Sequence, residues 1–252
     1  MKSLAILILT CNEEDNIADV VDNAKKCTDE VVVIDSGSTD RTVELAKEHG
    51  AKVAFRAWTN DFSAQRNFAL EQTDADWVLY LDADERLNDE VITEVKRIVA
   101  SGKMDAQYAF TRKSGAFGKV FSYGVLFPDQ VRRMFPRKEV MWVNKVHEHS
   151  ECKLPEKNLP GYVTHYTYKN WYEWEGKLCL YTTIWAEDAY KKGKKTTMAG
   201  IFQHSLGAFF KMFVLRRGFL DGGLGIYLCF AHGFYTMLKY LKLYDLQKSK
   251  SK

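Results

Sequence analysis

Short runs of mostly apolar residues recur through the first hundred residues, and longer amphipathic stretches separate them. A strand that is apolar along its whole length must be buried on both faces, which is typical of a parallel sheet covered by helices on either side. The pattern therefore predicts an α/β fold. The predicted strands are residues 4–9, 30–34, 52–55 and 77–81, and the predicted helices are residues 15–26, 39–49, 62–71 and 88–100.

The first of these runs lies close to the chain start and superficially resembles a signal peptide. It contains only six apolar residues, 4–9, and is followed by the polar residues 10–14. The apolar core of a signal peptide is longer and precedes a cleavage site of small residues. We therefore predict a buried strand here.

The character of the chain changes twice after the first hundred residues. Residues 105–165 alternate between apolar and polar, with glycine and proline between the runs, which predicts short antiparallel strands and loops. From residue 170 the pattern is helical, with breaks near 191–195 and 218–225. We predict a mainly α/β domain over residues 1–168 and a helical region over residues 169–252.

Charge is distributed unevenly between these two regions. The chain carries a net charge of +3, but residues 171–252 contain 13 Lys and Arg against 6 Asp and Glu. In residues 201–246 the basic residues flank apolar and aromatic stretches, which favours helices lying on a membrane surface that contains anionic lipid. The alternatives are that these helices pack on the first domain or form a homo-oligomer. The basic residues form no stripe that would follow a nucleic acid backbone, so we expect no nucleic acid partner.

The five cysteines are an odd number, lie far apart in the chain and include no CxxC spacing. This pattern predicts neither a structural zinc site nor a framework of disulfide bonds. We expect reduced thiols and a cytoplasmic protein.

Polar clusters follow the first, second and fourth predicted strands, at residues 10–14, 35–40 and 82–85. Ligands bind to open parallel sheets at the carboxyl ends of the strands, where these clusters would meet. The glycine-rich patterns of dinucleotide and P-loop sites are absent from the sequence. A diphosphate beside so many carboxylates would need a divalent cation, and the spacing of Asp82 and Asp84 suits a shared metal and sugar site.

Three motifs, taken in order, resemble family 2 glycosyltransferases with the GT-A fold: ILTCNEE at 8–14, VIDSGSTDRT at 33–42 and LDADE at 81–85. Features at 65–67, 146–149, 165–166 and 218–222 resemble more narrowly the bacterial β-glycosyltransferases of lipopolysaccharide core assembly. The resemblance implies a metal-dependent, inverting hexosyltransferase. It would move a sugar, glucose by resemblance, from a UDP-sugar to a lipid-linked saccharide such as the lipopolysaccharide inner core. The reaction would take place at the cytoplasmic face of the cell membrane.

The same resemblance assigns roles in binding the nucleotide. Thr10, Asn12 and Glu13 would line the nucleotide pocket. Asp35 would accept a hydrogen bond from the base, uracil N3–H by resemblance, because a carboxylate is an acceptor only. Arg66 would contact the phosphates or the ribose.

The resemblance also places the donor sugar and the metal. Asp82 and Ala83 would contact ribose or sugar, and Asp84 would hold Mg²⁺ or Mn²⁺ against the diphosphate. His165 is a candidate second metal ligand, with a buried structural histidine as the alternative.

An inverting transferase needs a general base to take the proton of the acceptor hydroxyl. Many relatives carry a Glu-Asp pair for this purpose, and residues 100–170 contain none. We predict Glu148 as the base, with Asp129 as the rival and a carboxylate paired with a neighbouring Arg or His as the structural alternative. Arg132 and Arg133 are predicted to contact acceptor phosphate, with surface ion pairs as the alternative.

Two other functions agree with parts of this pattern. A nucleotidyltransferase would also combine a nucleotide-binding sheet with acidic metal ligands, but it normally has a glycine-rich basic loop after the first strand. A non-catalytic membrane adaptor with this fold would be expected to have lost at least one of Asp35, Asp82 and Asp84, and all three are present. The sequence therefore favours the transferase.

Overall fold

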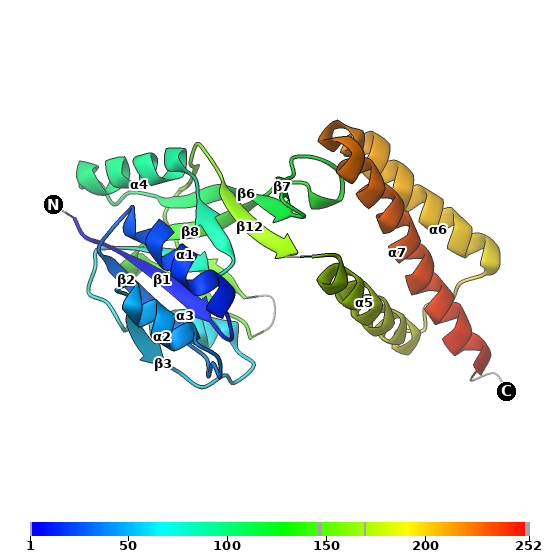
Figure 1. Ribbon diagram of the computed structural model, residues 1–252, viewed down its shortest axis with the longest axis horizontal. Coiled ribbons are helices and arrows are strands. Elements are labelled where there is room, and N and C mark those ends of the chain that lie inside the picture. The colour runs from blue at the N-terminus through cyan, green and yellow to red at the C-terminus, as the bar shows by residue number, and fades with distance from the viewer. Residues whose placement is uncertain (1, 146–147, 169, 250–252) are drawn as a thin grey trace. The chain divides into compact units, whose positions relative to one another are not determined.

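The computed structural model describes residues 2–145, 148–168 and 170–249 (Figure 1). The chain forms two compact units, which are described separately. The first unit comprises Met1–Arg112 and Asp129–His165, and the second comprises Lys113–Pro128 and Tyr166–Lys252.

A sheet forms the centre of the first unit. Its parallel part has the strand order β3-β2-β1-β4, and the predicted strands are confirmed. In the register of β1 and β2, Thr10 lies beside Asp35, so the polar clusters that follow the two strands meet at one edge. These strands are β1 (Leu4–Thr10), β2 (Glu30–Asp35), β3 (Lys52–Phe55) and β4 (Trp77–Asp82).

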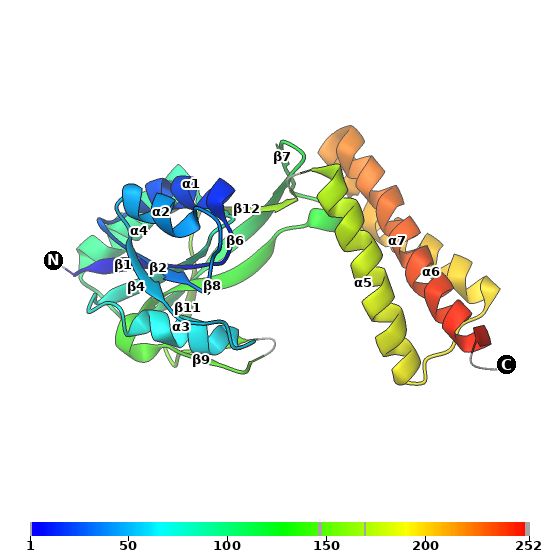
Figure 2. The ribbon, with the colours of Figure 1, turned by 60° about the horizontal axis from the view of Figure 1, so that its bottom comes forward.

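Helices cover both faces of this sheet, as Figure 2 shows. Alternate residues of each strand point to opposite faces. Ile6 and Ile8 belong to the core beneath α1, α2 and α4, whereas Leu7 and Tyr80 belong to the core beneath α3. The helices are α1 (Glu14–Lys25), α2 (Thr42–Glu48), α3 (Phe62–Leu70) and α4 (Asp89–Ser101).

Helix α2 begins at Thr42, three residues later than predicted. Residues 36–41 form a loop instead, because side chains outside that loop hold its backbone N–H groups. Asn12 Oδ1 accepts a hydrogen bond from Thr39 N at 2.8 Å, and the Asp35 carboxylate accepts one from Gly37 N at 3.0 Å.

Beyond β4 the sheet continues in the order β8-β6-β12-β5, and the strand pairs β4–β8, β6–β8 and β12–β5 are antiparallel. Residues 105–165 thus form the predicted short strands and loops, although β11 pairs with β6 in the parallel direction. Strands β9 and β10 form a separate antiparallel pair. The strands are β5 (Glu85–Leu87), β6 (Gln107–Ala116), β7 (Lys119–Val120), β8 (Asp129–Pro136), β9 (Met141–Val143), β10 (His149–Glu151), β11 (Glu156–Asn158) and β12 (Val163–Tyr168).

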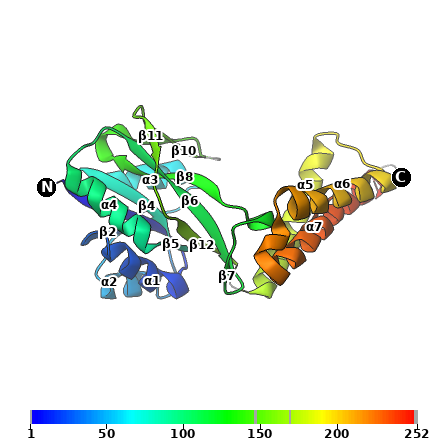
Figure 3. The ribbon, with the colours of Figure 1, turned by 90° about the horizontal axis from the view of Figure 1, so that it is seen from above.

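Three long helices form most of the second unit: α5 (Trp171–Lys191), α6 (Met198–Phe210) and α7 (Gly222–Ser249). Helix α7 packs against both α5 and α6, and α6 and α7 run side by side (Figure 3). A π-helical turn, Lys211–Leu215, and a 3₁₀ turn, Gly218–Asp221, connect α6 to α7. The longer of its two chain segments begins at Tyr166, close to the predicted boundary after residue 168. The shorter segment, Lys113–Pro128, belongs to the same unit.

The 3₁₀ turn holds the segment Lys113–Pro128 against the helices. The buried Asp221 carboxylate accepts hydrogen bonds from the backbone N–H groups of Ser122 and Tyr123, at 3.1 and 2.7 Å. Gly225, in the first turn of α7, packs directly on the carbonyl oxygen of Gly218. Close contacts therefore require glycine at positions 218 and 225 of this turn.

We expect Gly225→Ala to destabilise the protein by about 1–3 kcal/mol, the usual cost of overpacking. The new Cβ would overlap the Gly218 carbonyl oxygen and lie 2.6 Å from Asp221 Cβ. The matched control is Gly207→Ala in α6, where a Cβ meets nothing within 4 Å and should stabilise the helix by up to about 1 kcal/mol. Urea denaturation followed by circular dichroism measures both, and equal stabilities of the two variants would contradict the expectation.

Candidate active site

A pocket of about 470 Å³ opens at the carboxyl edge of the parallel strands. Residues from the loops after β1, β2 and β4, from α3 and from the segment before β10 contribute to it. Of the predicted site residues, it brings together Thr10, Glu13, Arg66, Asp82, Ala83, Asp84 and Glu148. The other lining residues are Leu9, Cys11, Ser36, Trp58, Phe62 and Gln65.

Asn12 and Asp35 shape the loops beside this pocket and are absent from its lining among the described residues. Asn12 adopts a left-handed backbone conformation, with φ of 53°, which asparagine tolerates better than most residues. Its backbone N–H donates to Ser38 Oγ at 2.8 Å, which ties the loop after β1 to the loop after β2. The Asp35 side chain is buried and holds the backbone of Gly37 and Ser38. Contacts of either residue with a nucleotide stay predictions.

Arg66 reaches the pocket from α3. Its guanidinium lies 4.6 Å from the centre of the Trp142 ring and 5.6 Å from that of Tyr80, so aromatic faces hold it on one side. Nη2 donates to Asp82 Oδ1 at 3.2 Å. Nη1 is buried and has no hydrogen-bond partner among the described residues. Because buried donors are almost always paired, this N–H group fits an oxygen atom of a bound ligand.

Arg133, on β8, joins the two carboxylates that flank the turn after β4. Its Nη2 lies 2.6 Å from Asp82 Oδ2 and 2.7 Å from Glu85 Oε1. Glu85 is fully buried, and its other oxygen accepts a hydrogen bond from the backbone N–H of Asp82 at 3.1 Å. Arg112 Nη1 adds a second cation, 3.5 Å from Glu85 Oε1. The turn that carries Asp84 is therefore fixed by buried ion pairs.

The two carboxylates respond differently to these cations. Burial alone would raise the pKa of Asp82, but the charges of Arg133 and Arg66 outweigh it and hold this pKa well below its usual range. The pKa of Glu85 is raised, because its complete burial outweighs the attraction of Arg133 and the Asp82 charge acts in the same direction as burial. Asp82 is thus held as an anion at the edge of the pocket.

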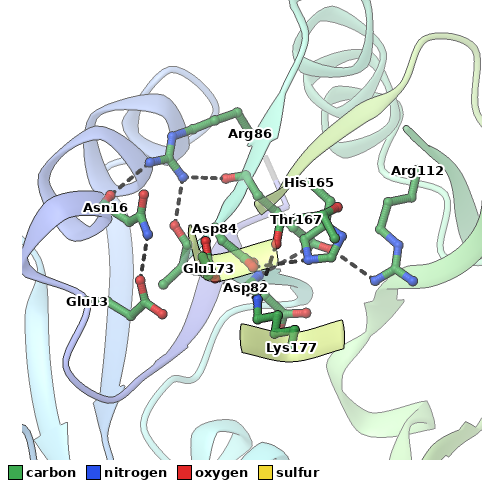
Figure 4. Close-up of polar contacts among 12 residues, drawn as sticks. Glu13, Asn16, Asp82, Asp84, Arg86, Arg112, His165, Thr167, Glu173 and Lys177 are labelled. Carbon is green, nitrogen blue, oxygen red and sulfur yellow. Dashed lines mark hydrogen bonds and ion pairs between the residues drawn. The ribbon is translucent and has the colours of Figure 1, made fainter. Parts of the chain in front are cut away.

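Asp84 turns away from this network toward His165 on β12, as Figure 4 shows. His165 lies opposite Glu85 in the antiparallel pair of β12 and β5, and its Nε2 is 3.0 Å from Asp84 Oδ2. Burial lowers the pKa of His165, but the Asp84 carboxylate outweighs burial and the net shift is upward. Both side chains keep part of their surface exposed.

A carboxylate oxygen and an imidazole nitrogen at this separation could be two ligands of one divalent cation. Mg²⁺ and Mn²⁺ complete their coordination with phosphate oxygens and water, so two protein ligands are sufficient in a nucleotide site. Within the described residues, no cluster of three or more His, Cys, Asp or Glu side chains could hold a metal ion. The pair Asp84 and His165 therefore fits a metal that is held jointly with the substrate.

Glu148 lies where the pocket meets a second, polar cavity of about 430 Å³, and it lines both. Its Oε1 is 3.7 Å from Arg66 Nε, and about a quarter of its side chain is exposed. The rival Asp129 forms a two-point ion pair with Arg112, at 3.0 and 2.8 Å, and is not among the described residues that line either cavity. Glu148 thus lines both cavities and Asp129 lines neither, and the identity of the base stays a prediction. The predicted motif at 146–149 includes Val146 and His147, which lie outside the described residues.

The two predicted acceptor arginines differ in their surroundings. Arg132 is half-exposed, pairs with Glu156 at 2.8 Å and lines the polar cavity. Arg133 is buried, and its charge is already paired with Asp82 and Glu85. Arg133 therefore supports the turn after β4, and contact of either arginine with an acceptor stays a prediction.

Several pocket residues received no individual role from the sequence, although Gln65 belongs to the motif at 65–67. Gln65 is fully buried, and its Nε2 donates to Ser36 Oγ at 3.0 Å and to the Arg56 carbonyl at 2.8 Å. Trp58 and Phe62 form an aromatic wall, with ring centres 4.6 Å apart. Two aromatic residues close together in the sequence, one shortly before α3 and one at its first position, were the signal that could have located this wall.

The sequence model of glycosyl transferase family 2 matches residues 5–148, which is more than half of the chain. The chain belongs to this family. The match ends at Glu148 and includes every loop that contributes to the first pocket. The predicted α/β GT-A fold with a C-terminal helical appendage is confirmed.

Two relatives of this family 2 glycosyltransferase illustrate the range of similarity. An uncharacterized glycosyltransferase of Rickettsia typhi (strain ATCC VR-144 / Wilmington) is 30% identical over 258 residues, which cover 98% of this chain and 88% of the relative. The lipopolysaccharide core biosynthesis glycosyltransferase LpsC of Rhizobium meliloti (strain 1021) is 27% identical over 208 residues, which cover 76% of this chain and 73% of LpsC.

Similar solved structures include TarS 1–349 of S. aureus in complex with UDP-GlcNAc. It is 14% identical, with a TM-score of 0.49, and the match covers 99% of this chain and 92% of TarS 1–349. Glucosyl-3-phosphoglycerate synthase of Mycobacterium tuberculosis, in complex with Mn²⁺, UDP and glucosyl-3-phosphoglycerate, is 18% identical, with a TM-score of 0.44. That match covers 78% of this chain and 82% of the synthase.

We expect Arg133→Met to destabilise the glycosyltransferase by about 3 kcal/mol or more, because it leaves Asp82 and Glu85 without their shared buried cation. Arg132→Met is the matched control at the neighbouring position. It removes a half-exposed ion pair with Glu156, which is worth about 1 kcal/mol or less, and a long hydrogen bond to the Ser150 carbonyl at 3.5 Å. Urea denaturation of both variants checks the difference, and a similar small loss for both would show that Arg133 is not structurally important.

Proposed function

We propose that this family 2 glycosyltransferase moves a sugar from a UDP-sugar to a lipid-linked saccharide, with inversion at the anomeric carbon. The observation that carries the proposal is that one pocket joins Asp84, beside His165, to Glu148 and to Arg66, whose Nη1 has no partner among the described residues. A candidate metal ligand, a candidate anion ligand and a carboxylate that can accept a proton thus line one cavity.

The donor would enter with its diphosphate between Arg66 and the pair Asp84 and His165. Arg66 Nη1 would donate to a phosphate oxygen, which satisfies a buried group that has no partner in the described protein. The buried Thr10 Oγ1 likewise has no partner among the described residues and can bond the nucleoside. Uracil as the base and glucose as the sugar rest on the family resemblance.

Asp84 and His165 would hold Mg²⁺ or Mn²⁺. When bound, the cation would neutralise charge that develops on the departing diphosphate, as a Lewis acid does. Asp82 would stay bound to Arg66 and Arg133 and would orient the donor sugar or ribose from a fixed position.

Glu148 would take the proton of the acceptor hydroxyl, which then attacks the anomeric carbon from the side opposite the diphosphate. One displacement of this kind inverts the configuration and converts an α-linked donor into a β-linked product. The place of Glu148 between the donor pocket and the polar cavity supports this role. A general base that bridges the two substrates must reach both of them.

The acceptor would occupy the polar cavity beside Glu148, where Arg132 is available to an acidic group. The similarity to LpsC, which spans three quarters of this chain, supports a lipopolysaccharide core saccharide as the acceptor class. Such a substrate would place the reaction at the cytoplasmic face of the cell membrane. Membership of the family favours sugar transfer over the nucleotidyltransferase and adaptor alternatives.

Isothermal calorimetry of UDP with and without Mn²⁺ or Mg²⁺ tests the donor site. We expect the cation to strengthen UDP binding and Asp84→Asn to weaken the cation-dependent binding at least about tenfold. The matched control is Asp74→Asn, which removes a fully exposed carboxylate that is not among the pocket-lining residues. UDP binding that is absent, or the same with and without cation, would contradict the proposed donor site.

Glu148→Gln is expected to lower turnover about 100-fold or more, because glutamine keeps the shape of the side chain but cannot take a proton. UDP affinity should be nearly unchanged. Asp129→Asn is the matched control, since it changes the rival carboxylate and should keep most activity. Release of UDP in the presence of acceptor measures turnover, and the opposite ranking of the two variants would move the base to Asp129.

A further inference from the structure

The second unit exposes an apolar surface that none of the proposed chemistry uses. Within the described residues, Met198–Leu215 is the one helical segment long and apolar enough to cross a membrane, and only 6% of it is buried. Water-soluble monomers rarely expose large contiguous apolar surfaces unless these bind a partner.

Five phenylalanine rings form a continuous part of this surface, which we call the phenylalanine patch. Phe209 on α6 lies 4.7 Å from Phe230 on α7, measured between ring centres, and so joins the two helices. Phe230 is 60% exposed and Phe210 is 56% exposed. The patch comprises Phe209, Phe210, Phe213, Phe219 and Phe230, with neighbouring ring centres 4.7 to 5.5 Å apart.

Exposed cations border the patch. Lys211, Arg216 and Arg217 lie in the connection between α6 and α7, and their side chains form no ion pair with any carboxylate in the described part of the chain. Residues 190–244 contain nine Lys and Arg but a single acidic residue, Asp221. Asp221 is buried and bound to backbone N–H groups, so it does not balance the surface charge.

We infer that the phenylalanine patch lies in the headgroup region of a bilayer that contains anionic lipid, with Lys211, Arg216 and Arg217 bound to lipid phosphates. Aromatic rings bordered by cations suit the membrane interface. There the rings pack at the boundary between headgroups and acyl chains, and the cations are attracted to the negative charges of anionic lipids. This inference goes beyond the proposed function and does not depend on any bound nucleotide.

Charge argues against a second copy of this chain as the partner. A two-fold contact through the patch would bring the three cations of each copy close to those of the other, and like charges repel.

An interfacial position also explains the structure better than a membrane span. Segment Met198–Leu215 contains Gln203, His204 and Lys211, and α6 packs along α7, which carries Lys239 and Lys242. Helix α6 could not enter the hydrocarbon core without drawing these charges with it or losing its contacts with α7.

The test is co-sedimentation of the full chain with phosphatidylcholine vesicles, with and without phosphatidylglycerol, in the absence of UDP and metal. We expect binding to the anionic vesicles at least about tenfold tighter than to the neutral ones, and weaker binding in about 1 M salt. The triple variant Lys211→Gln/Arg216→Gln/Arg217→Gln should weaken binding by about 10- to 100-fold. The double variant Phe210→Ser/Phe230→Ser should weaken it about tenfold or more.

Matched controls are Lys26→Gln/Lys47→Gln/Lys103→Gln and Met141→Ser, which change exposed residues of the first unit. They should bind vesicles as the unaltered chain does. Circular dichroism checks that every variant is folded. If the phenylalanine variant is unfolded, the charge variant still tests the inference.

Three results would overturn the inference: no vesicle binding, equal binding to both lipids, or equal loss in the control variants. Light scattering without vesicles identifies the main competitor. A dimer that Phe210→Ser/Phe230→Ser converts to a monomer, without vesicle binding, would assign the patch to a second copy. Because the assay contains no nucleotide, its failure is separate from failure of the proposed transferase activity.

Discussion

The buried contact of Arg133 with Asp82 and Glu85 holds the candidate active site together. A cation removed from water is stabilised only when carboxylates surround it closely, and these two lie 2.6 and 2.7 Å from the same nitrogen. The contact ties β8 to the turn after β4 and leaves Asp84 free to face His165. A catalytic group is useful only when its position is fixed before the substrate arrives, and this ion pair supplies that fixed position.

The two halves of the sheet contribute different parts of the site. The parallel strands bring the loops after β1, β2 and β4 to one edge, which forms the donor pocket. The antiparallel half returns Arg133 and His165 to the same edge from far along the chain, and the segment before β10 of the separate β9–β10 pair adds Glu148. In the proposed reaction, the first half binds the nucleotide, the antiparallel half supplies the second metal ligand, and the segment before β10 supplies the base.

The second unit differs from the first in its packing. Its helices share a small core around Ala186, Ile201 and Tyr240, whereas most of α6 is exposed. The unit also contains the glycine-rich turn, in which Asp221 binds the backbone of Lys113–Pro128. A unit with an exposed apolar surface and unbalanced positive charge is suited to the bilayer surface that we infer for it.

The sequence by itself determined the family, the α/β fold, the parallel strands and the three acidic loops, because apolar periodicity and short motifs are local properties. It also identified Asp84, His165 and Glu148 as candidates, but the contact of Asp84 with His165, 81 residues later, depends on the pairing of β5 with β12. Only the tertiary structure decided that Arg133 supports the turn after β4, that Asn12 and Asp35 hold loops, and that Trp58, Phe62 and Gln65 line the pocket. Side-chain partners of this kind depend on register and burial, which local sequence patterns do not specify.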